Sequence, residues 1–223
     1  LEEVAALVDT QMAGLADYSV RPAYERVTAV MSLNYDESGD EEIAKRVITM
    51  LYHGALGYDK IPNIVLEDFG KRSTALPGLC VFAYDRVYNS PYWEELSAQT
   101  GTDVRGAVED WFLKAFDYII KLNAGSYYDN RGAYWLKNAA GIALILNDPD
   151  RMRQVISALD TCMTSNEWHA DGMWSEGTFS YGQQFAGNGS EAADVINLYR
   201  DPYGYTDTSL VLVLDGSINM HDR

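Results

Sequence analysis

The chain has 223 residues, of which 47% are hydrophobic and 22% are charged, as is typical of a soluble globular protein with a sizeable core. Its formal net charge of -16 repels nucleic acids and anionic membrane surfaces, and its lysines and arginines form no basic run. These properties argue against a nucleic-acid-binding protein and against a highly sulfated ligand. No apolar stretch is long enough to predict a membrane span.

The first part of the chain shows helical periodicity interrupted by polar turns. Helices are predicted over residues 2–18 and 22–35, with a turn that ends at Pro22 between them. The polar segment 36–40 breaks the pattern and can cap the next helix. Apolar or small residues then recur on one helical face at Ile43, Val47, Met50, Leu51 and Gly54.

The middle of the chain continues this pattern of helical pairs. A loop is predicted over residues 58–70 because of Pro62 and Gly70. A helix is expected to follow over about 71–88, with Pro77 at a bend or near its start. The clearest helix of the sequence comes next, after a cap at Thr102 or Asp103. Its wide apolar stripe consists of Val104, Val108, Trp111, Phe112, Ala115, Phe116, Ile119 and Ile120.

Two further helices are predicted before the composition changes. One covers about residues 136–147, and the next continues to Met163 with Asp148 as its N-cap and Pro149 in its first turn. Beyond residue 165 the chain is rich in Gly, Trp, Tyr, Ser and Asn. We therefore predict a loop-rich segment until about residue 190, where a short helix resumes.

The cysteines and histidines predict no metal or redox site. Cys80 and Cys162 each lie in an apolar stretch, which is typical of buried thiols rather than of a disulfide framework. The histidines, His53, His169 and His221, lack the spacing of metal ligands. We therefore expect two buried free thiols, no metal and no cofactor.

These patterns predict an all-α protein built from antiparallel helical hairpins. Small residues such as Ala139, Ala140 and Gly141 permit close helix approach. The sequence has no obvious repeat of fixed length, which argues against a simple solenoid. Residues 211–214 are ambiguous between a strand and a buried helix. We expect an incomplete (α/α) toroid, in which residues 1–223 form a single domain that is truncated at both ends and surrounds one cleft.

Two segments at predicted helix ends or in loops are dense in polar and aromatic side chains, and loops commonly carry functional residues. The first, residues 127–135, reads Tyr-Tyr-Asp-Asn-Arg-Gly-Ala-Tyr-Trp. The second, residues 171–184, contains the pattern Asp-Gly-x-x-x-Glu-Gly-x-x-Ser-Tyr. The residues of this pattern are Asp171, Gly172, Glu176, Gly177, Ser180 and Tyr181.

The second pattern resembles one in the heparinase II/III-like polysaccharide lyases, whose α/α toroid brings a catalytic Tyr into its cleft. In that family an Asn-containing segment precedes a small-residue helix, and here Asn130 lies 51 residues before Tyr181. The resemblance covers about residues 70–200. Gly182 stands where many family members have His after the Tyr, and Arg131 stands where related alginate lyases have His after the Asn.

The resemblance implies a lyase that cleaves uronic-acid-containing glycans by β-elimination without a cofactor. Its partner would be an acidic polysaccharide. It also implies a β-sandwich domain after the toroid in the full-length parent, which in the family often supplies a catalytic His. A secreted or periplasmic location follows from the same resemblance.

The reaction gives roles to Asn130, Arg131 and Tyr181. A lyase removes the proton α to the uronate carboxylate and expels the 4-linked oxygen. An amide donor and a cation at that carboxylate, supplied by Asn130 and Arg131, stabilise the enolate-like transition state. Tyr181 then acts as the acid, and as the base if a cation such as Arg131 lowers its pKa from about 10. The structural alternatives are a helix cap for Asn130 and a surface pair with Asp129 for Arg131.

Further side chains are candidate substrate contacts. Aromatic rings can stack on sugars, polar side chains can bind hydroxyl groups, and one histidine lies on a predicted helix. These candidates are Trp135, Trp174, Tyr134, Glu176, Gln184 and His53. Packing in the core is the alternative for the tryptophans, and a bond to loop N–H groups is the alternative for Glu176.

Three other functions are compatible with the same segments. A hyaluronate- or chondroitin-type lyase shares the toroid, although Gly182 stands where its His is expected. An inverting glycoside hydrolase on an α/α barrel would use Asp171 and Glu176, with their carboxylates about 6.5–9.5 Å apart around a water. The third is a non-catalytic glycan-binding or scaffold domain.

Overall fold

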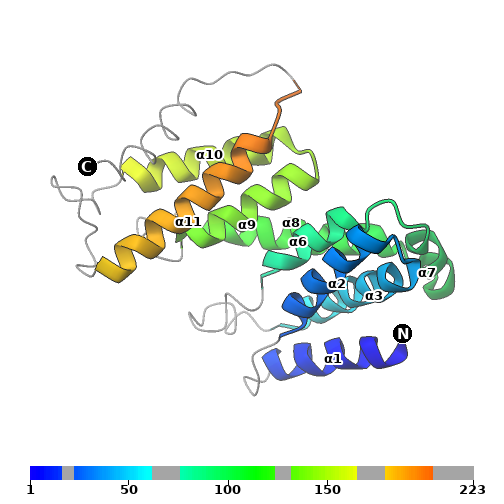
Figure 1. The fold of residues 1–223 in the computed structure, drawn as a ribbon. Helices are drawn as coiled ribbons and strands as arrows, with labels where there is room; N and C mark the ends of the chain where they lie inside the picture. Colours follow the sequence, from blue (N-terminus) through cyan, green and yellow to red (C-terminus); the bar gives the residue numbers. More distant parts are fainter. Residues whose placement is uncertain (17–22, 62–75, 124–131, 165–178, 203–223) are drawn as a thin grey trace. The chain divides into compact units, whose positions relative to one another are not determined.

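The computed structural model describes residues 1–16, 23–61, 76–123, 132–164 and 179–202 (Figure 1). Every regular element in these ranges is an α-helix, so the prediction of an all-α protein is confirmed. Residues 211–214, which were ambiguous in the sequence, lie outside the described residues. Within the described ranges, no helix is long and apolar enough to cross a membrane.

The chain forms two compact units, residues 1–115 and 116–223. The boundary falls inside helix α8 (Val104–Asn123), so this helix contributes residues to both units. Each unit has buried apolar side chains of its own. That residues 1–223 form one toroid domain stays a prediction.

Unit 1 contains α1 (Glu2–Ala16), α2 (Tyr24–Ser38), α3 (Glu41–Tyr58), α6 (Gly78–Arg86), α7 (Tyr92–Thr100) and the first part of α8. Helix α2 ends at Gly39, whose φ of 65° is the left-handed conformation that favours glycine. Asp40 then caps α3, since its carboxylate accepts a hydrogen bond from the N–H of Glu42 at 3.0 Å. The predicted cap within residues 36–40 is confirmed, although α2 extends into this segment as far as Ser38.

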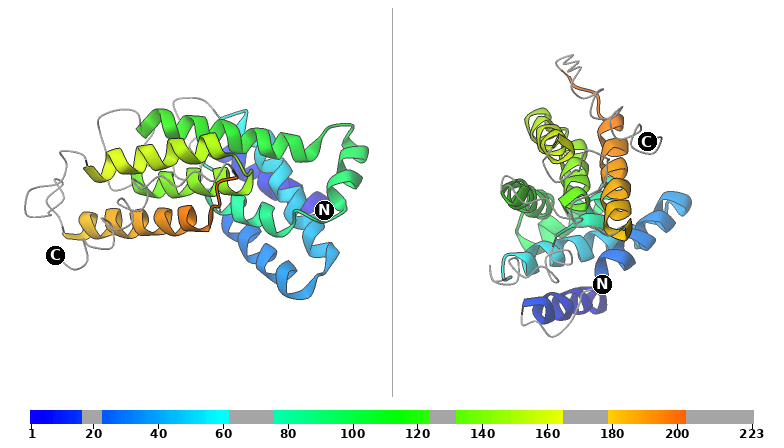
Figure 2. Two further views of the ribbon diagram at one scale, coloured as in Figure 1. Left: turned by 90° about the horizontal axis from the view of Figure 1, so that it is seen from above. Right: turned by 90° about the vertical axis from the view of Figure 1, so that its left-hand side faces the viewer.

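Helices of like direction pack together in unit 1. Helix α1 packs against α3, and these two helices run in one direction, whereas α2 packs against α6, and both of these run in the opposite direction (Figures 1 and 2). The contact of α1 with α3 requires Gly57, because a Cβ at this position would lie 2.6 Å from the Cβ of Met12. Successive antiparallel hairpins produce this alternation of directions.

An aromatic cluster joins α6, α7 and α8 in the core of unit 1. The ring of Tyr84 makes edge contacts with the rings of Trp93 and Phe112, at centroid distances of 5.3 and 5.5 Å. The Tyr84 hydroxyl donates to the Glu109 carboxylate, and Nε1 of Trp93 donates to the carbonyl of Val87 at 2.9 Å. The polar atoms of both buried rings are therefore paired.

Two predictions for unit 1 need correction. The helix expected over about 71–88 begins only at Gly78, directly after Pro77, and it ends at Arg86. Helix α7 was not predicted, because it has nine residues and too few apolar positions to show a helical period. The predicted loop at 58–70 begins after Tyr58, the last residue of α3, and residues 62–75 lie outside the described residues.

Unit 2 contains the end of α8, α9 (Gly132–Ile145), α10 (Pro149–Thr164) and α11 (Phe179–Leu198). The turn between α9 and α10 places Asn147 at a φ of 50°, a conformation that Asn tolerates well. The Asp148 carboxylate then accepts the N–H of Arg151 at 3.0 Å, and Pro149 is the first residue of α10. The cap and the proline position predicted here are confirmed, and α9 and α10 form an antiparallel hairpin.

The prediction of a loop-rich segment until about residue 190 is wrong for its last part. Helix α11 begins at Phe179, so Tyr181 lies in a helix rather than in a loop. Gly182, Gly187 and Gly189 give this sequence a low intrinsic helix propensity. Packing against α9 outweighs that low propensity.

Both cysteines are buried thiols, as predicted. Cys80 lies on α6 of unit 1 and Cys162 lies on α10 of unit 2. Each thiol is therefore part of the core of a different unit.

Candidate functional site

Helices α9 and α11 pack side by side in unit 2 and run in the same direction (Figures 1 and 2). Small buried residues let their backbones approach each other, since the distance between packed helices depends on the side chains at the contact. These residues are Ala139, Ala140 and Gly141 on α9, and Ala192 on α11. Both helices therefore begin at the same end of unit 2.

An ion pair sets the register between the two helices. Nζ of Lys137 on α9 pairs with the carboxylate of Glu191 on α11. A helix rises about 1.5 Å per residue, so Gly132 lies about 7.5 Å before this pair and Tyr181 lies about 15 Å before it. Measured along the helix axes, the backbone of Tyr181 therefore lies about 7–8 Å farther from the ion pair than the first residue of α9 does.

The catalytic candidates are associated with this end of unit 2. Tyr181 lies in the first turn of α11 and Gln184 lies in the next turn, and their side chains are outside the described part of the chain. Asn130 and Arg131 directly precede α9 in the sequence and lie outside the described residues. Also outside the described residues are Asp171, Trp174 and Glu176.

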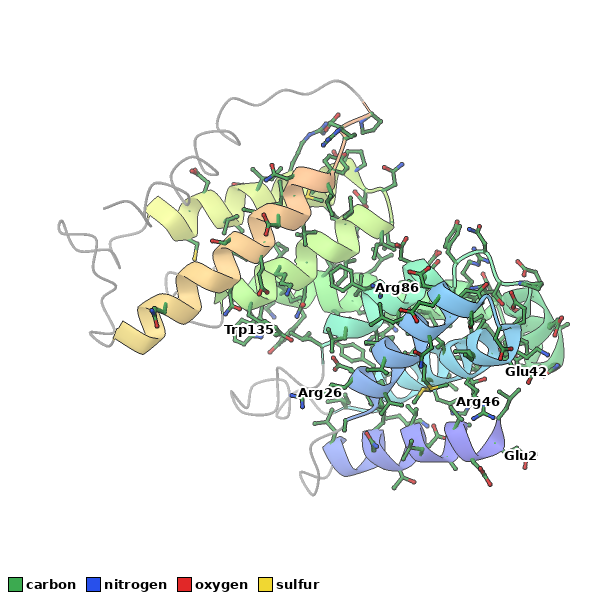
Figure 3. All side chains as sticks on the ribbon, viewed as in Figure 1. Glu2, Arg26, Glu42, Arg46, Arg86 and Trp135 are labelled. Carbon is green, nitrogen blue, oxygen red and sulfur yellow. The ribbon has the colours of Figure 1, made fainter. Side chains whose placement is uncertain are left out.

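Two aromatic candidates lie in the first turn of α9. The side chain of Trp135 is buried near the start of the helix (Figure 3), and the residue is only 4% exposed. Tyr134 is half-buried. Because a sugar needs an accessible ring face, this burial favours packing as the role of Trp135. Tyr134 remains a candidate substrate contact.

Asn138 is a polar residue of α9 that the sequence analysis did not single out as functional. It lies one turn after Trp135 and is 3% exposed. Its Nδ2 atom has no hydrogen-bond partner in the part of the chain that the structure describes. Most buried amides have partners, so an unpaired one is a functional signal. The signal in the sequence was an Asn directly before the small apolar residues Ala139, Ala140 and Gly141 of a predicted helix.

The candidate His53 lies on α3 of unit 1. Its Nδ1 atom is 2.8 Å from Oδ1 of Asp9 on α1, and its ring meets the ring of Tyr52 edge-on at 5.7 Å. An imidazole held between two helices in this way links α1 to α3. This arrangement favours a structural role for His53.

A buried group of ionisable side chains, also missed in the sequence, lies where α2 packs against α6. It consists of Tyr24, Glu25 and Cys80. Burial raises the pKa of Glu25 to about 8. A hydrogen bond to the backbone of Leu79 and the charge of Arg26 lower this pKa, but their effect is smaller than that of burial. Burial also raises the pKa of Tyr24 and of Cys80, and the charge of Glu25 adds to both effects. The Tyr24 hydroxyl has no hydrogen-bond partner among the described residues.

An open hollow of about 450 Å³ lies in unit 1 where α7 ends and α8 begins. The guanidinium of Arg105 in this hollow lies 4.6 Å from the ring centroid of Tyr88 and 5.4 Å from that of Trp93. It also lies 3.7 Å from the carboxylate of Glu94. Because this cation is already paired, the hollow is a weaker candidate than the end of unit 2 at which α9 and α11 begin.

Among the described residues, no three His, Cys, Asp or Glu side chains are grouped so that they could hold a metal ion. No protein-family model matches the chain, and neither a curated protein nor a solved structure matches it.

Proposed function

We propose that this protein is a polysaccharide lyase that cleaves uronic-acid-containing glycans by β-elimination. The observation that carries the proposal is the common end at which α9 and α11 begin. Asn130 and Arg131 directly precede α9 in the sequence, and α11 contains Tyr181. The sequence pattern and the helix directions thus support the same grouping of residues.

In the proposed reaction, Asn130 and Arg131 bind the uronate carboxylate. They neutralise the negative charge that opposes removal of the proton on the adjacent carbon. The electron pair of that C–H bond forms a C=C bond, and the bond to the 4-linked oxygen breaks. Tyr181 gives its proton to the leaving oxygen. For Tyr181 to act as the base as well, the charge of Arg131 must lower the pKa of its phenol, so that the phenolate takes the first proton and then passes it to the leaving oxygen.

The helix directions also support the toroid that the proposal includes. Within unit 2, α10 runs opposite to α9, and α11 again runs with α9. Within unit 1, α2 runs opposite to α1, and α3 again runs with α1. In an (α/α) toroid, helices of the same layer have this common direction, so that the connections before them lie at one rim. The proposal extends to a β-sandwich domain in the full-length protein and to a secreted or periplasmic location.

The proposal predicts an unsaturated sugar product. The protein should be incubated with a panel of uronic-acid glycans, and the ultraviolet absorbance of the new C=C bond should be followed. Tyr181→Phe removes the proposed acid and should lower the elimination rate about 10²–10⁴-fold. Tyr88→Phe is the matched control, since this half-exposed tyrosine lies in unit 1 on the surface and should leave the rate unchanged.

Full activity of the Tyr181→Phe variant would contradict the role of Tyr181. New reducing ends without ultraviolet absorbance would instead identify a hydrolase, with Asp171 and Glu176 as its carboxylates. Glycan binding without any cleavage would identify the non-catalytic alternative.

A further inference from the structure

Helix α2 exposes a stripe of apolar side chains on the face opposite to its core residues. Val27, Val30 and Leu33 are 41%, 58% and 47% exposed. The buried residues of the same helix are Tyr24, Thr28 and Ser32. Isolated exposed apolar residues are normal on a protein surface, but three on successive turns of one helix form a continuous apolar face.

Charged residues of opposite sign lie at the two ends of this stripe. Arg26 lies in the first turn of α2 (Figure 3) and Glu37 lies in its last turn, and both are exposed. The positions 26, 30, 33 and 37 are spaced by four, three and four residues, which places them on one helical face. In the described ranges, no ion pair occupies either charge, whereas the neighbouring Asp36 is already paired with Arg86 at 3.5 Å.

We propose that the α2 stripe binds the α2 stripe of a second copy of this chain, with the two helices antiparallel. In the register that matches both ends, Val30 packs against the partner's Leu33, and Arg26 pairs with the partner's Glu37. A two-fold axis then repeats each contact, because residue i meets residue j in both directions. We call this pair of helices the α2–α2 dimer.

The charges favour a second copy over an unrelated partner. The stripe is positive at its start and negative at its end, so it is complementary to itself only when the two helices are antiparallel. A parallel pair would place Arg26 beside Arg26 and Glu37 beside Glu37, which is repulsive. A shift by one helical turn would leave both charges without a partner, so the charges also fix the register.

The small area of the stripe sets the expected strength of the dimer. A stable interface usually buries at least about 1,200 Å² in total, and three side chains from each copy cover less than this. The dimer should therefore be weak and should form at about 100 µM protein, where weak association is measurable. The net charge of -16 on each copy adds repulsion, so the dimer should be more stable at moderate salt than at very low salt.

Sedimentation equilibrium over a range of protein concentrations tests the α2–α2 dimer. Val30→Glu should abolish the dimer, because it places a charge at the centre of the apolar contact. Arg26→Glu and Glu37→Arg should each weaken it on the order of tenfold, and the double variant should recover the wild-type dissociation constant. Arg46→Glu is the matched control, since this exposed arginine on α3 changes the net charge equally and should leave the dimer unaffected.

A wild-type protein that stays monomeric at all concentrations would overturn the proposal. A dimer that tolerates Val30→Glu, or that does not recover in the double charge variant, would also overturn it. So would a Val30→Glu monomer that has lost its far-ultraviolet helical signal, because the stripe would then be covered within one chain. Glycan cleavage is not needed for any of these measurements, so this test is independent of the proposed lyase activity.

Discussion

The carboxyl of Glu25 lies where α2 packs against α6, close to Tyr24 and Cys80. Part of the residue reaches solvent, but the carboxyl itself is buried, and its environment determines the pKa. Burial raises this pKa from 4.5 to about 8, so the folded protein holds a proton that the unfolded chain has already lost. The contribution of Glu25 to stability is therefore fully present below about pH 4.5 and is lost as the pH rises to about 8.

Glu25→Gln should make unit 1 more stable at pH 8 while changing little at pH 5. Gln keeps the shape of the side chain and never carries the charge whose burial is costly. One unit of pKa shift equals about 1.4 kcal/mol, so the gain at pH 8 should be about 2–4 kcal/mol. Urea unfolding at both pH values measures it.

Glu3→Gln, at an exposed position of α1, is the control and should not change the pH dependence. If Glu25→Gln destabilises the protein at pH 8, then the carboxylate is a stabilising cap of α6 and its burial is not costly.

Single residues were predictable from sequence where their effect is local. Caps were predicted within residues 36–40, at Thr102 or Asp103, and at Asp148, and the structure has them at Asp40, Asp103 and Asp148. Such caps are predictable because a cap binds N–H groups only two or three residues later. The burial of Glu25 and Asn138 was not predictable in the same way. It depends on which helices pack against these residues, and no short sequence pattern contains that information.

At the scale of helices, two glycines inside helices have opposite roles. A Cβ on Gly57 of α3 would lie 2.6 Å from the Cβ and Cγ atoms of Met12, so Gly57→Ala must push α1 away from α3. We expect a loss of about 1–3 kcal/mol in the free energy of unfolding. Hydrogen exchange of α1 amides and urea unfolding would measure the change.

Gly187 of α11 provides the contrasting variant. No atom lies within 4 Å of the Cβ that an alanine would add, so Gly187→Ala should stabilise α11 by about 0.5–1 kcal/mol through helix propensity. Equal effects of the two alanine variants would show that α1 is not held against α3 by close backbone contact.

Helix prediction succeeded where periodicity and caps agreed, as in α8 and α10. It was wrong for α11, whose glycines predict a loop, and it missed α7, which is too short to show a period. Tertiary contacts explain both cases: α11 packs along α9, and α7 packs against α3 and contacts α6 through the rings of Trp93 and Tyr84, whose centroids are 5.3 Å apart. Such long-range partners are absent from any local window of sequence.

At the scale of the whole chain, the net charge of -16 predicts a salt effect on stability. Repulsion among the acidic residues acts over about 30 Å at 0.01 M salt and only about 8 Å at 0.15 M. The melting temperature should therefore rise by about 2–5 °C between these conditions. Calorimetry with sodium chloride and with choline chloride would separate screening from binding of a specific ion.

A melting temperature that falls with salt would show that ion pairs such as Lys114 with Asp59 and Asp110 outweigh the general repulsion.

The all-α class followed from composition and periodicity, since these report how much of each helix is apolar. The directions of α9 and α11, which bring their first residues to one end of unit 2, required the structure. The motif could place Asn130 and Tyr181 in one site only by resemblance. Their separation of 51 residues contains a hairpin whose geometry the sequence does not encode locally.

The two buried thiols make it possible to follow the opening of each unit without any mutation. The chain has two cysteines, and Cys80 lies in unit 1 while Cys162 lies in unit 2. An alkylating reagent reaches a buried sulfur only when the surrounding core opens. Mass analysis of the two cysteine peptides after timed alkylation therefore gives a separate opening rate for each half of the molecule.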